Sequence, residues 1–191
     1  MKKILFVLLF YLLAACSQKN PQFNAIDITG AGYAKDFKLT DHTGKVRTMA
    51  DFNGKVVGLF FGYTQCPDVC PTTMSDMAQV MKKLGKDSER VQVLFVTLDP
   101  KRDTPELLAQ YVPSFHPGFL GLTGDERTIK KTAKDFKIYA QQVEGKTPGS
   151  YTIDHTAGMF VFDPSGRLRL FVSYGMVPDK ITADFRSLLT D

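Results

Sequence analysis

The sequence lacks the clusters of basic residues by which many proteins contact nucleic acid. Its 24 lysines and arginines are offset by 20 acidic residues, giving a formal net charge of +4. No run of Lys and Arg reaches the roughly five to eight residues of a nucleic-acid-binding patch. Neither a G-x-x-x-x-G-K-[ST] phosphate loop nor a G-x-G-x-x-G turn occurs, which argues against P-loop nucleotide chemistry and a standard dinucleotide fold. We therefore expect no nucleic-acid partner.

Glycine and proline are also too scarce for a disordered or low-complexity chain. There are 15 glycines and 10 prolines among 191 residues, while 43% of the residues are hydrophobic. That apolar content is sufficient for one domain with a substantial core. No internal repeat occurs and no linker follows residue 34, so we predict a single domain over residues 35–191.

The apolar stretch at the start of the chain, residues 4–15, is too short to cross a bilayer, which takes about 20 apolar residues. It follows two lysines and ends in Leu-Ala-Ala-Cys16, which predicts a signal peptide over residues 1–15. The ending resembles the lipobox of bacterial lipoproteins, and this implies cleavage before Cys16 and acylation of that residue. Several acyl chains would anchor the protein stably. The alternative is an ordinary secretory peptide with an unrelated cysteine.

This leader predicts a bacterial lipoprotein anchored on the periplasmic side of a membrane. Ser17 follows the cysteine, which favours the outer membrane under the usual sorting rule of Gram-negative lipoproteins. Residues 16–34 are polar and irregular, and we interpret them as a tether. With Cys16 acylated, only Cys66 and Cys70 remain. In an extracytoplasmic compartment such a pair tends to oxidise unless it is kept reduced or bound to metal.

Strand and helix signals alternate along the rest of the chain. Residues 37–39 and 45–47 flank a turn sequence and predict a hairpin. Nearly continuous apolar runs such as KVVGLFF are typical of strands buried on both faces. Strands are predicted at 55–61, 91–98, 119–122, 158–162 and 168–172, an extended segment at 138–143, and helices at 71–84, from Thr104 onward, at 125–136 and at 178–189. The pattern predicts an α/β fold with a mixed sheet between helix layers.

Cys66 and Cys70 lie where a buried strand leads into a helix. A spacing of four places both sulfurs on one face if the first helical turn includes them. The free N–H groups of a helix start lower a thiol pKa and favour the thiolate. Such thiols react with disulfides or bind a metal, whereas a purely structural disulfide would close a loop too small to stabilise the fold much.

A metal site would need a further ligand, because two thiolates fall short of the four ligands of structural zinc. The candidates are three histidines. His42 lies in the hairpin turn and His116 in a loop, and both are expected to be exposed; His155 precedes an apolar strand and is either a loop histidine or a ligand. Two soft thiolates with one imidazole suit copper in both oxidation states, provided that an acceptor holds the other ring N–H.

Three segments, FGYTQCPDVCP, VTLDPKRDTPELL and IDHTAGMFVFDPSG, occur in this order. They resemble the Sco/SenC family of copper-binding proteins over roughly residues 35–190. The resemblance implies a thioredoxin-like fold and copper ligation by Cys66, Cys70 and His155. It also implies a role in assembling the dinuclear copper centre of cytochrome c oxidase, as copper carrier, as thiol reductant of the target's cysteines, or both. Family members often carry His at the position of Gln65, and we expect this difference to alter copper exchange or redox tuning without removing a ligand.

The sequence therefore predicts a metallochaperone that binds Cu(I) and Cu(II) and passes copper to an oxidase subunit. The alternative is a thiol–disulfide oxidoreductase without copper, although the cysteine spacing exceeds C-x-x-C by one residue and His155 would then have no role. A peroxiredoxin-like peroxidase fits poorly, because Tyr63 stands where that chemistry places Thr. Asp68 and Asp99 either tune the site electrostatically or act only at a helix start and a turn.

Overall fold

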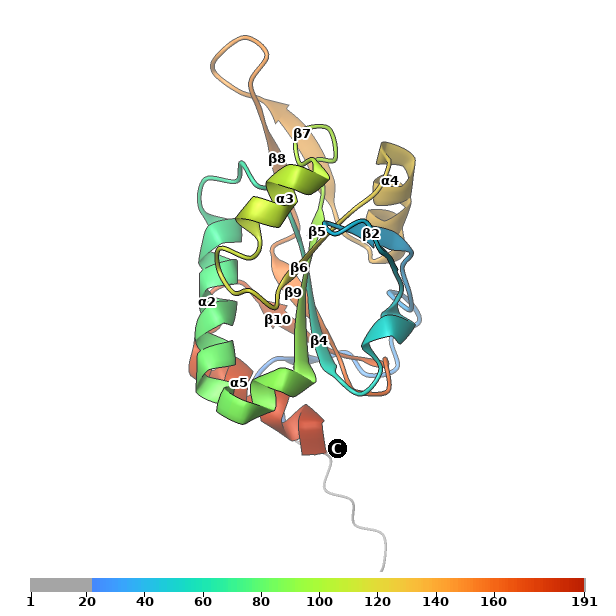
Figure 1. The fold of residues 1–191 in the computed structure, drawn as a ribbon, viewed down its shortest axis with the longest axis vertical. Helices are drawn as coiled ribbons and strands as arrows, with labels where there is room; N and C mark the ends of the chain where they lie inside the picture. Colours follow the sequence, from blue (N-terminus) through green and yellow to red (C-terminus); the bar gives the residue numbers. More distant parts are fainter. Residues whose placement is uncertain (1–21, 191) are drawn as a thin grey trace, which may run out of the picture.

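The computed structural model describes residues 22–190, so the predicted signal peptide and Cys16 lie outside the described residues. Eight strands form one mixed sheet in the order β1-β10-β9-β4-β5-β6-β2-β3 (Figure 1). Its strands are β1 (Ile26–Asp27), β2 (Leu39–Asp41), β3 (Val46–Arg47), β4 (Val56–Gly62), β5 (Val91–Thr97), β6 (Leu120–Thr123), β9 (Gly158–Phe162) and β10 (Leu168–Ser173). Strands β7 (Ala140–Glu144) and β8 (Tyr151–His155) form a separate antiparallel pair, the β7–β8 ribbon.

Helices cover both faces of the large sheet. The helical segments are α2 (Val69–Leu84), α3 (Pro105–Tyr111), α4 (Glu126–Asp135) and α5 (Pro178–Thr190), with short 3-10 turns η1 (Met49–Phe52) and η2 (Gly85–Arg90). Helices α2, α3 and α5 pack on one face, and α4 and η1 pack on the other (Figure 1). The predicted α/β class and the N-terminal hairpin are confirmed. No helix within residues 22–190 combines the length and hydropathy needed to span a bilayer.

The central strands are apolar along their whole length because both faces are covered. Along β4, Val56 and Phe60 enter the core under α2 and α5, while Val57, Leu59 and Phe61 enter the core under α4. Strands β4, β5 and β6 run parallel, with α2 and α3 as crossovers, and β9 joins β4 antiparallel. The carboxyl ends of β4 and β5 therefore meet at one edge of the sheet, where ligands bind in open α/β folds.

Local side-chain chemistry sets where the helices begin. The Thr104 hydroxyl accepts a hydrogen bond from the Leu107 amide at 3.3 Å, with Pro105 in the first helical turn. The Asp125 carboxylate caps α4 in the same way, accepting from the Thr128 amide at 2.7 Å. The expected start of α3 at Thr104 is confirmed.

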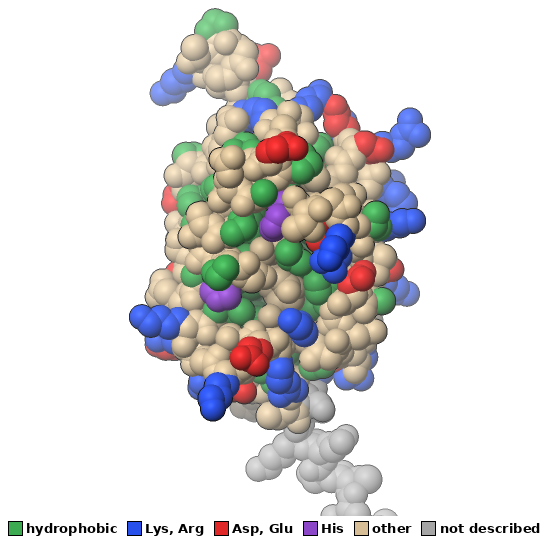
Figure 2. Space-filling model, in the orientation of Figure 1, with side chains coloured by type: hydrophobic (Ala, Val, Ile, Leu, Met, Phe, Trp, Pro, Cys, Tyr) green, Lys and Arg blue, Asp and Glu red, His purple; other side chains and the backbone are tan. Residues whose placement is uncertain are grey.

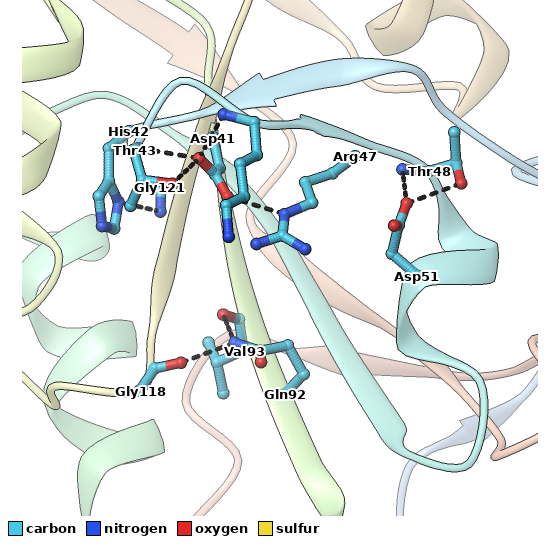
Figure 3. A network of polar contacts seen from close by, with 11 residues as sticks. Asp41, His42, Thr43, Arg47, Thr48, Asp51, Gln92, Val93, Gly118 and Gly121 are labelled. Carbon is cyan, nitrogen blue, oxygen red and sulfur yellow. Dashed lines mark hydrogen bonds and ion pairs between the residues drawn. The ribbon is translucent and has the colours of Figure 1, made fainter.

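The predicted hairpin closes through the carboxylate of Asp41 (Figure 3). It accepts from the amide and hydroxyl of Thr43 at 2.8 and 2.6 Å and from Arg47 Nε at 2.7 Å. Burial opposes ionisation of Asp41, but these hydrogen bonds outweigh it and lower its pKa to about 2. His42 was expected to be exposed; it is half-buried, and its Nδ1 accepts from the Gly121 amide at 3.0 Å, joining the hairpin to β6.

Two further segments differ from the sequence prediction. The ribbon strand β8 was not predicted, because its residues alternate between exposed and half-buried and present no apolar run. Residues 24–34 pack on the domain, whereas a tether was predicted over 16–34. The reason is the carboxylate of Asp184, 1% exposed, which accepts from the Asn24 and Ala25 amides at 2.9 and 2.8 Å and so holds the start of this segment in place.

Charged side chains lie scattered over the face of the molecule seen in Figure 2, with acidic groups among the lysines and arginines. Most of the ion pairs are exposed, such as Lys83 with Asp179 at 2.8 Å and Lys101 with Glu126 at 3.2 Å. Exposed pairs of this kind contribute little to stability. The fold therefore depends mainly on the two apolar layers.

Candidate metal centre

The two cysteines follow the carboxyl end of β4 but do not share a helical turn. Helix α2 begins at Val69, so Cys70 lies in its first turn while Cys66 lies in the preceding loop, residues 63–68, here named the thiol loop. The prediction that one helical face carries both sulfurs is wrong. Pro67 disfavours helical backbone at Cys66, and a turn in which the Cys66 amide donates to the Tyr63 carbonyl at 3.2 Å brings the sulfurs together instead.

Cys70 is completely buried against the end of β4. A Cβ added at Gly62 would lie 2.8 Å from Cys70 Sγ and 2.9 Å from the Phe60 ring, so only glycine lets the sulfur approach the strand this closely. Burial, reinforced by the neighbouring sulfur of Cys66, raises the pKa of the Cys70 thiol well above its ordinary value. The expected lowering by the helix start is therefore wrong for Cys70, because desolvation of the thiolate outweighs the helix N–H groups.

His155 ends strand β8 and points its ring at the thiols. Its Nε2 lies 3.7 Å from Cys70 Sγ, and its Nδ1 lies 3.0 Å from the Thr156 carbonyl. Because the carbonyl can only accept, Nδ1 carries the proton and Nε2 keeps a free lone pair. The ring packs edge-on against Tyr63 and Phe60, and burial lowers the pKa of His155 below 6.5. The imidazole is therefore neutral near pH 7, as a metal ligand must be.

The sulfurs of Cys66 and Cys70 and a ring nitrogen of His155 lie within 4.8 Å of one another. Three ligands around one ion with bonds of about 2.2 Å stand roughly 3.8 Å apart, and the 3.7 Å between Cys70 Sγ and His155 Nε2 matches this spacing. Both thiols are free and the donor set is soft. The site thus fits a three-coordinate copper ion.

The donors open into a pocket of about 330 Å³ between the thiol loop and the ribbon. The half-buried Cys66 and His155 line this pocket, whereas the buried Cys70 does not. Asp68 and Asp154 also line it. Asp68 occupies the N-cap position of α2 but its side chain makes no capping hydrogen bond, so it contributes negative charge at the mouth of the pocket. A ligand exchanged with a partner protein would reach the ion from the side of Cys66.

The remaining candidates do not join the metal donors. His116, expected to be exposed, is half-buried, and its Nδ1 accepts from the Gly118 amide at 3.1 Å within its own loop. Asp99 is 4% exposed, and its carboxylate accepts from Arg102 Nε and from the Tyr151 hydroxyl. Asp99 therefore does more than act at a turn, since it holds Arg102 and Tyr151 in place. Its electrostatic tuning of the site stays a prediction.

Sequence reasoning missed Asp103, Arg102 and Tyr151, which surround the thiol loop. Asp103 accepts from the amide and hydroxyl of Thr64, and Arg102 donates to Gln65 and to the Tyr151 carbonyl. The segment VTLDPKRDTPELL was recognised, but its pattern does not indicate which of its charged side chains turn inward. Only their contacts in the folded chain, with Thr64, Gln65 and Tyr151, reveal it.

The family model of SCO1/SenC matches residues 27–190. The chain belongs to the SCO1/SenC family. It is 42% identical over 141 residues to the mitochondrial SCO2 homolog of Danio rerio, a match that covers 73% of this chain and 50% of that protein. The chain therefore spans about half the length of this relative. The resemblance noted from the three sequence segments is confirmed.

Solved structures of Sco proteins have the same fold as this chain. Bradyrhizobium japonicum ScoI with copper bound superposes with a TM-score of 0.74 at 39% identity, covering 80% of this chain and 97% of that one. A SCO1/SenC family lipoprotein of Bacillus anthracis gives a TM-score of 0.69 at 26% identity, covering 80% and 92%. The thioredoxin-like fold expected for a Sco/SenC protein is thus confirmed.

Proposed function

We propose that this SCO1/SenC protein binds copper through Cys66, Cys70 and His155 and passes it to a cytochrome c oxidase subunit as the dinuclear copper centre is assembled. The observation that carries the proposal is the convergence of two thiol sulfurs and a neutral imidazole nitrogen within 4.8 Å. Family membership and the copper-bound ScoI structure support the choice of copper. Both Cu(I) and Cu(II) suit two thiolates and one imidazole.

Binding and release follow from the burial of each donor. Cys70 is buried and protonated before the metal arrives, so copper displaces its proton; His155 is already neutral, with Nε2 free. Cys66 and His155 are the donors that line the pocket, on the side away from the buried Cys70. A thiol or thioether of the recipient would enter on that side and replace the donors one at a time, so that copper moves without dissociating into solution.

The test is copper stoichiometry and spectroscopy of the reduced domain, comparing wild type with Cys66→Ala and His155→Ala. We expect one copper per chain and a thiolate-to-Cu(II) charge-transfer band that is lost without Cys66 and altered without His155. His116→Ala is a matched control, since the contacts of that ring are with Gly118 and Phe119, close to it in the chain. An unchanged Cu(II) spectrum and affinity in His155→Ala would contradict the three-donor site.

Copper affinity should rise as the pH rises. The pKa of Cys70 is raised above 9.0, so at neutral pH copper must displace that proton; the pKa of His155 is lowered below 6.5, so its ring needs no deprotonation above that pH. The apparent Cu(I) affinity should therefore rise at least about tenfold per pH unit between pH 7 and 9, one proton being displaced. Competition with a Cu(I) chelator, corrected for the chelator's own titration, measures this. A pH-independent affinity would show that Cys70 is not a ligand.

A second function is favoured by the unequal burial of the thiols. Cys66 is half-buried and Cys70 fully buried, the arrangement of an attacking and a resolving cysteine. Cys66 thiolate would attack a target disulfide, and Cys70 would then attack Cys66 Sγ, releasing the target as a dithiol and leaving a Cys66–Cys70 disulfide. An external thiol reductant would be needed to restore the pair. Reduction of a disulfide target by the metal-free protein, undiminished in His155→Ala, would favour this function.

The leader bears on where these reactions occur. We propose that the chain is cleaved before Cys16, acylated there and held on the periplasmic side of a membrane, with Ser17 favouring the outer membrane. The SCO1/SenC family lipoprotein of Bacillus anthracis supports the acylation in this proposal. Because the described chain already contacts the domain at Asn24, the tether in this proposal is shorter than residues 16–34.

A further inference from the structure

His155 is carried by a ribbon that the main sheet does not hold. Strands β7 and β8 pair only with each other, and the ribbon projects beyond the end of the large sheet (Figure 1). Next to the ribbon, the Tyr139 amide donates to the Thr156 hydroxyl at 3.0 Å. Tyr139 directly precedes β7 and Thr156 directly follows β8, so this hydrogen bond does not tie the ribbon to the large sheet. All of β7 is exposed. Side-chain contacts must therefore keep β8, and with it His155, beside the thiols.

Arg102 contacts the thiol loop and strand β8 at the same time. Its Nη1 donates to Gln65 Oε1 at 3.1 Å and to the Tyr151 carbonyl at 3.0 Å. Its guanidinium carbon also lies 3.5 Å from the centroid of the Tyr151 ring, a stacked cation–π contact. One planar side chain thus joins the residue before Cys66 to the first residue of β8, and only a guanidinium has the fork and the flat face to do so.

Asp99 holds the other side of this arrangement. Its buried carboxylate accepts from Arg102 Nε and, at 2.9 Å, from the Tyr151 hydroxyl, and its own amide donates to the Thr97 hydroxyl at the end of β5. Both members of the stacked pair are therefore fixed to the sheet. Arg102 Nη2, however, is buried and has no hydrogen-bond partner within the described residues. The closed arrangement thus leaves one donor unsatisfied, which lowers the cost of opening it.

We propose that Arg102 is a positioning residue: it latches the β7–β8 ribbon to the thiol loop and thereby sets how readily His155 leaves the metal. The inference rests on the proposed copper site. Strand β8 is only five residues long, with Tyr151 at one end and His155 at the other. Release of Tyr151 therefore leaves the strand held only at Ile153, which bonds to the Tyr63 hydroxyl through its backbone, and by the packing of the imidazole itself. Gln65, the residue before Cys66, serves as the acceptor of the latch on the side of the thiol loop.

The test compares Arg102→Lys and Tyr151→Phe with Lys101→Ala. Lysine keeps a positive charge beside Asp99 but loses the fork; phenylalanine keeps the stacked ring but loses the hydroxyl. Lys101 is the adjacent control, because its ammonium group makes only an exposed ion pair. We expect Cu(I) transfer to bathocuproine disulfonate to be about tenfold faster in Arg102→Lys, in the range found for loss of an outer-shell partner, severalfold faster in Tyr151→Phe, and unchanged in Lys101→Ala.

Two further measurements separate the latch from a general loss of stability. In the His155→Ala background, Arg102→Lys should add no further acceleration; an undiminished effect there would overturn the proposal. In the metal-free protein, amide hydrogen exchange should quicken over residues 151–155 in Arg102→Lys while β4 and β5 keep their protection. Unchanged exchange at 151–155 would overturn the latch even if copper is bound as proposed, whereas failure of the wild type to bind copper would refute the proposed function and leave the exchange test decisive for the latch.

Discussion

Replacing Cys70 with alanine should abolish copper binding while leaving the domain folded. The Cys70 sulfur is the most buried donor and lies 3.7 Å from His155 Nε2. Without it one thiolate and one imidazole remain, and this pair binds Cu(I) more weakly than two thiolates with an imidazole. We expect the apparent Cu(I) affinity to fall at least about a thousandfold, well beyond the roughly 10- to 100-fold cost of losing an outer-shell partner. Competition with a Cu(I) chelator measures the loss.

Alanine is the appropriate replacement because the Cys70 thiol is protonated and surrounded by apolar groups in the metal-free protein. Serine would bury a hydroxyl in the same place and add an unrelated cost. Urea unfolding of the metal-free proteins supplies the folding control, and we expect Cys70→Ala to lose about 1 kcal/mol, as for a small buried group. Wild-type copper affinity in a folded Cys70→Ala protein would place the metal elsewhere.

Replacing Asp103 with alanine should give the largest loss of stability among the polar residues near the site. The carboxylate is 1% exposed and accepts from the Thr64 amide at 3.0 Å, the Thr64 hydroxyl at 2.6 Å and the Thr97 hydroxyl at 2.6 Å. Removing it leaves these donors without their acceptor in a buried place. We expect the free energy of unfolding to fall by about 3 kcal/mol, with individual unsatisfied donors costing about 1–3 kcal/mol each. Urea unfolding measures this.

The same substitution should also loosen the thiol loop, because Thr64 lies within it. Burial raises the pKa of Asp103, and the hydrogen bonds from the threonines oppose that shift. Burying the carboxylate costs free energy, which is offset only when all of these donors are present. Asp103→Asn retains one acceptor oxygen and should lose about half as much stability. Asp179→Ala, whose side chain is 80% exposed, should change stability by less than about 0.5 kcal/mol. An Asp103→Ala protein as stable as Asp179→Ala would contradict this account.

Much of the fold is predictable because it depends on short-range pattern. The apolar runs of β4 and β5 identify strands covered on both faces, and Thr104 followed by Pro105 identifies the start of α3. The spacing of Cys66 and Cys70 indicates a reactive or metal-binding pair. The family resemblance then points to His155, which local sequence alone leaves open.

Features that arise from contacts between distant residues were not predictable in the same way. In strand β8, Tyr151 and Ile153 alternate with the exposed Thr152 and Asp154, but the alternation covers too few residues to identify a strand. Asn24 and Ala25 are held by Asp184, about as far along the chain as any pair of residues in the domain. Arg102 joins Gln65 to Tyr151. The sequence of its loop shows which side chains are charged, but not which of them point toward the site.

The sequence by itself determined which thiols and imidazoles are available as metal donors, most of the elements of its α/β domain and the family to which it belongs. The tertiary structure alone decided that Cys66 stands outside α2, that Cys70 is so desolvated that its pKa rises, and that a ribbon held by Arg102 carries His155 to the sulfurs. The physical reason is that residue type and spacing act over a few positions, whereas ligand geometry and desolvation depend on segments that meet only when the chain has folded.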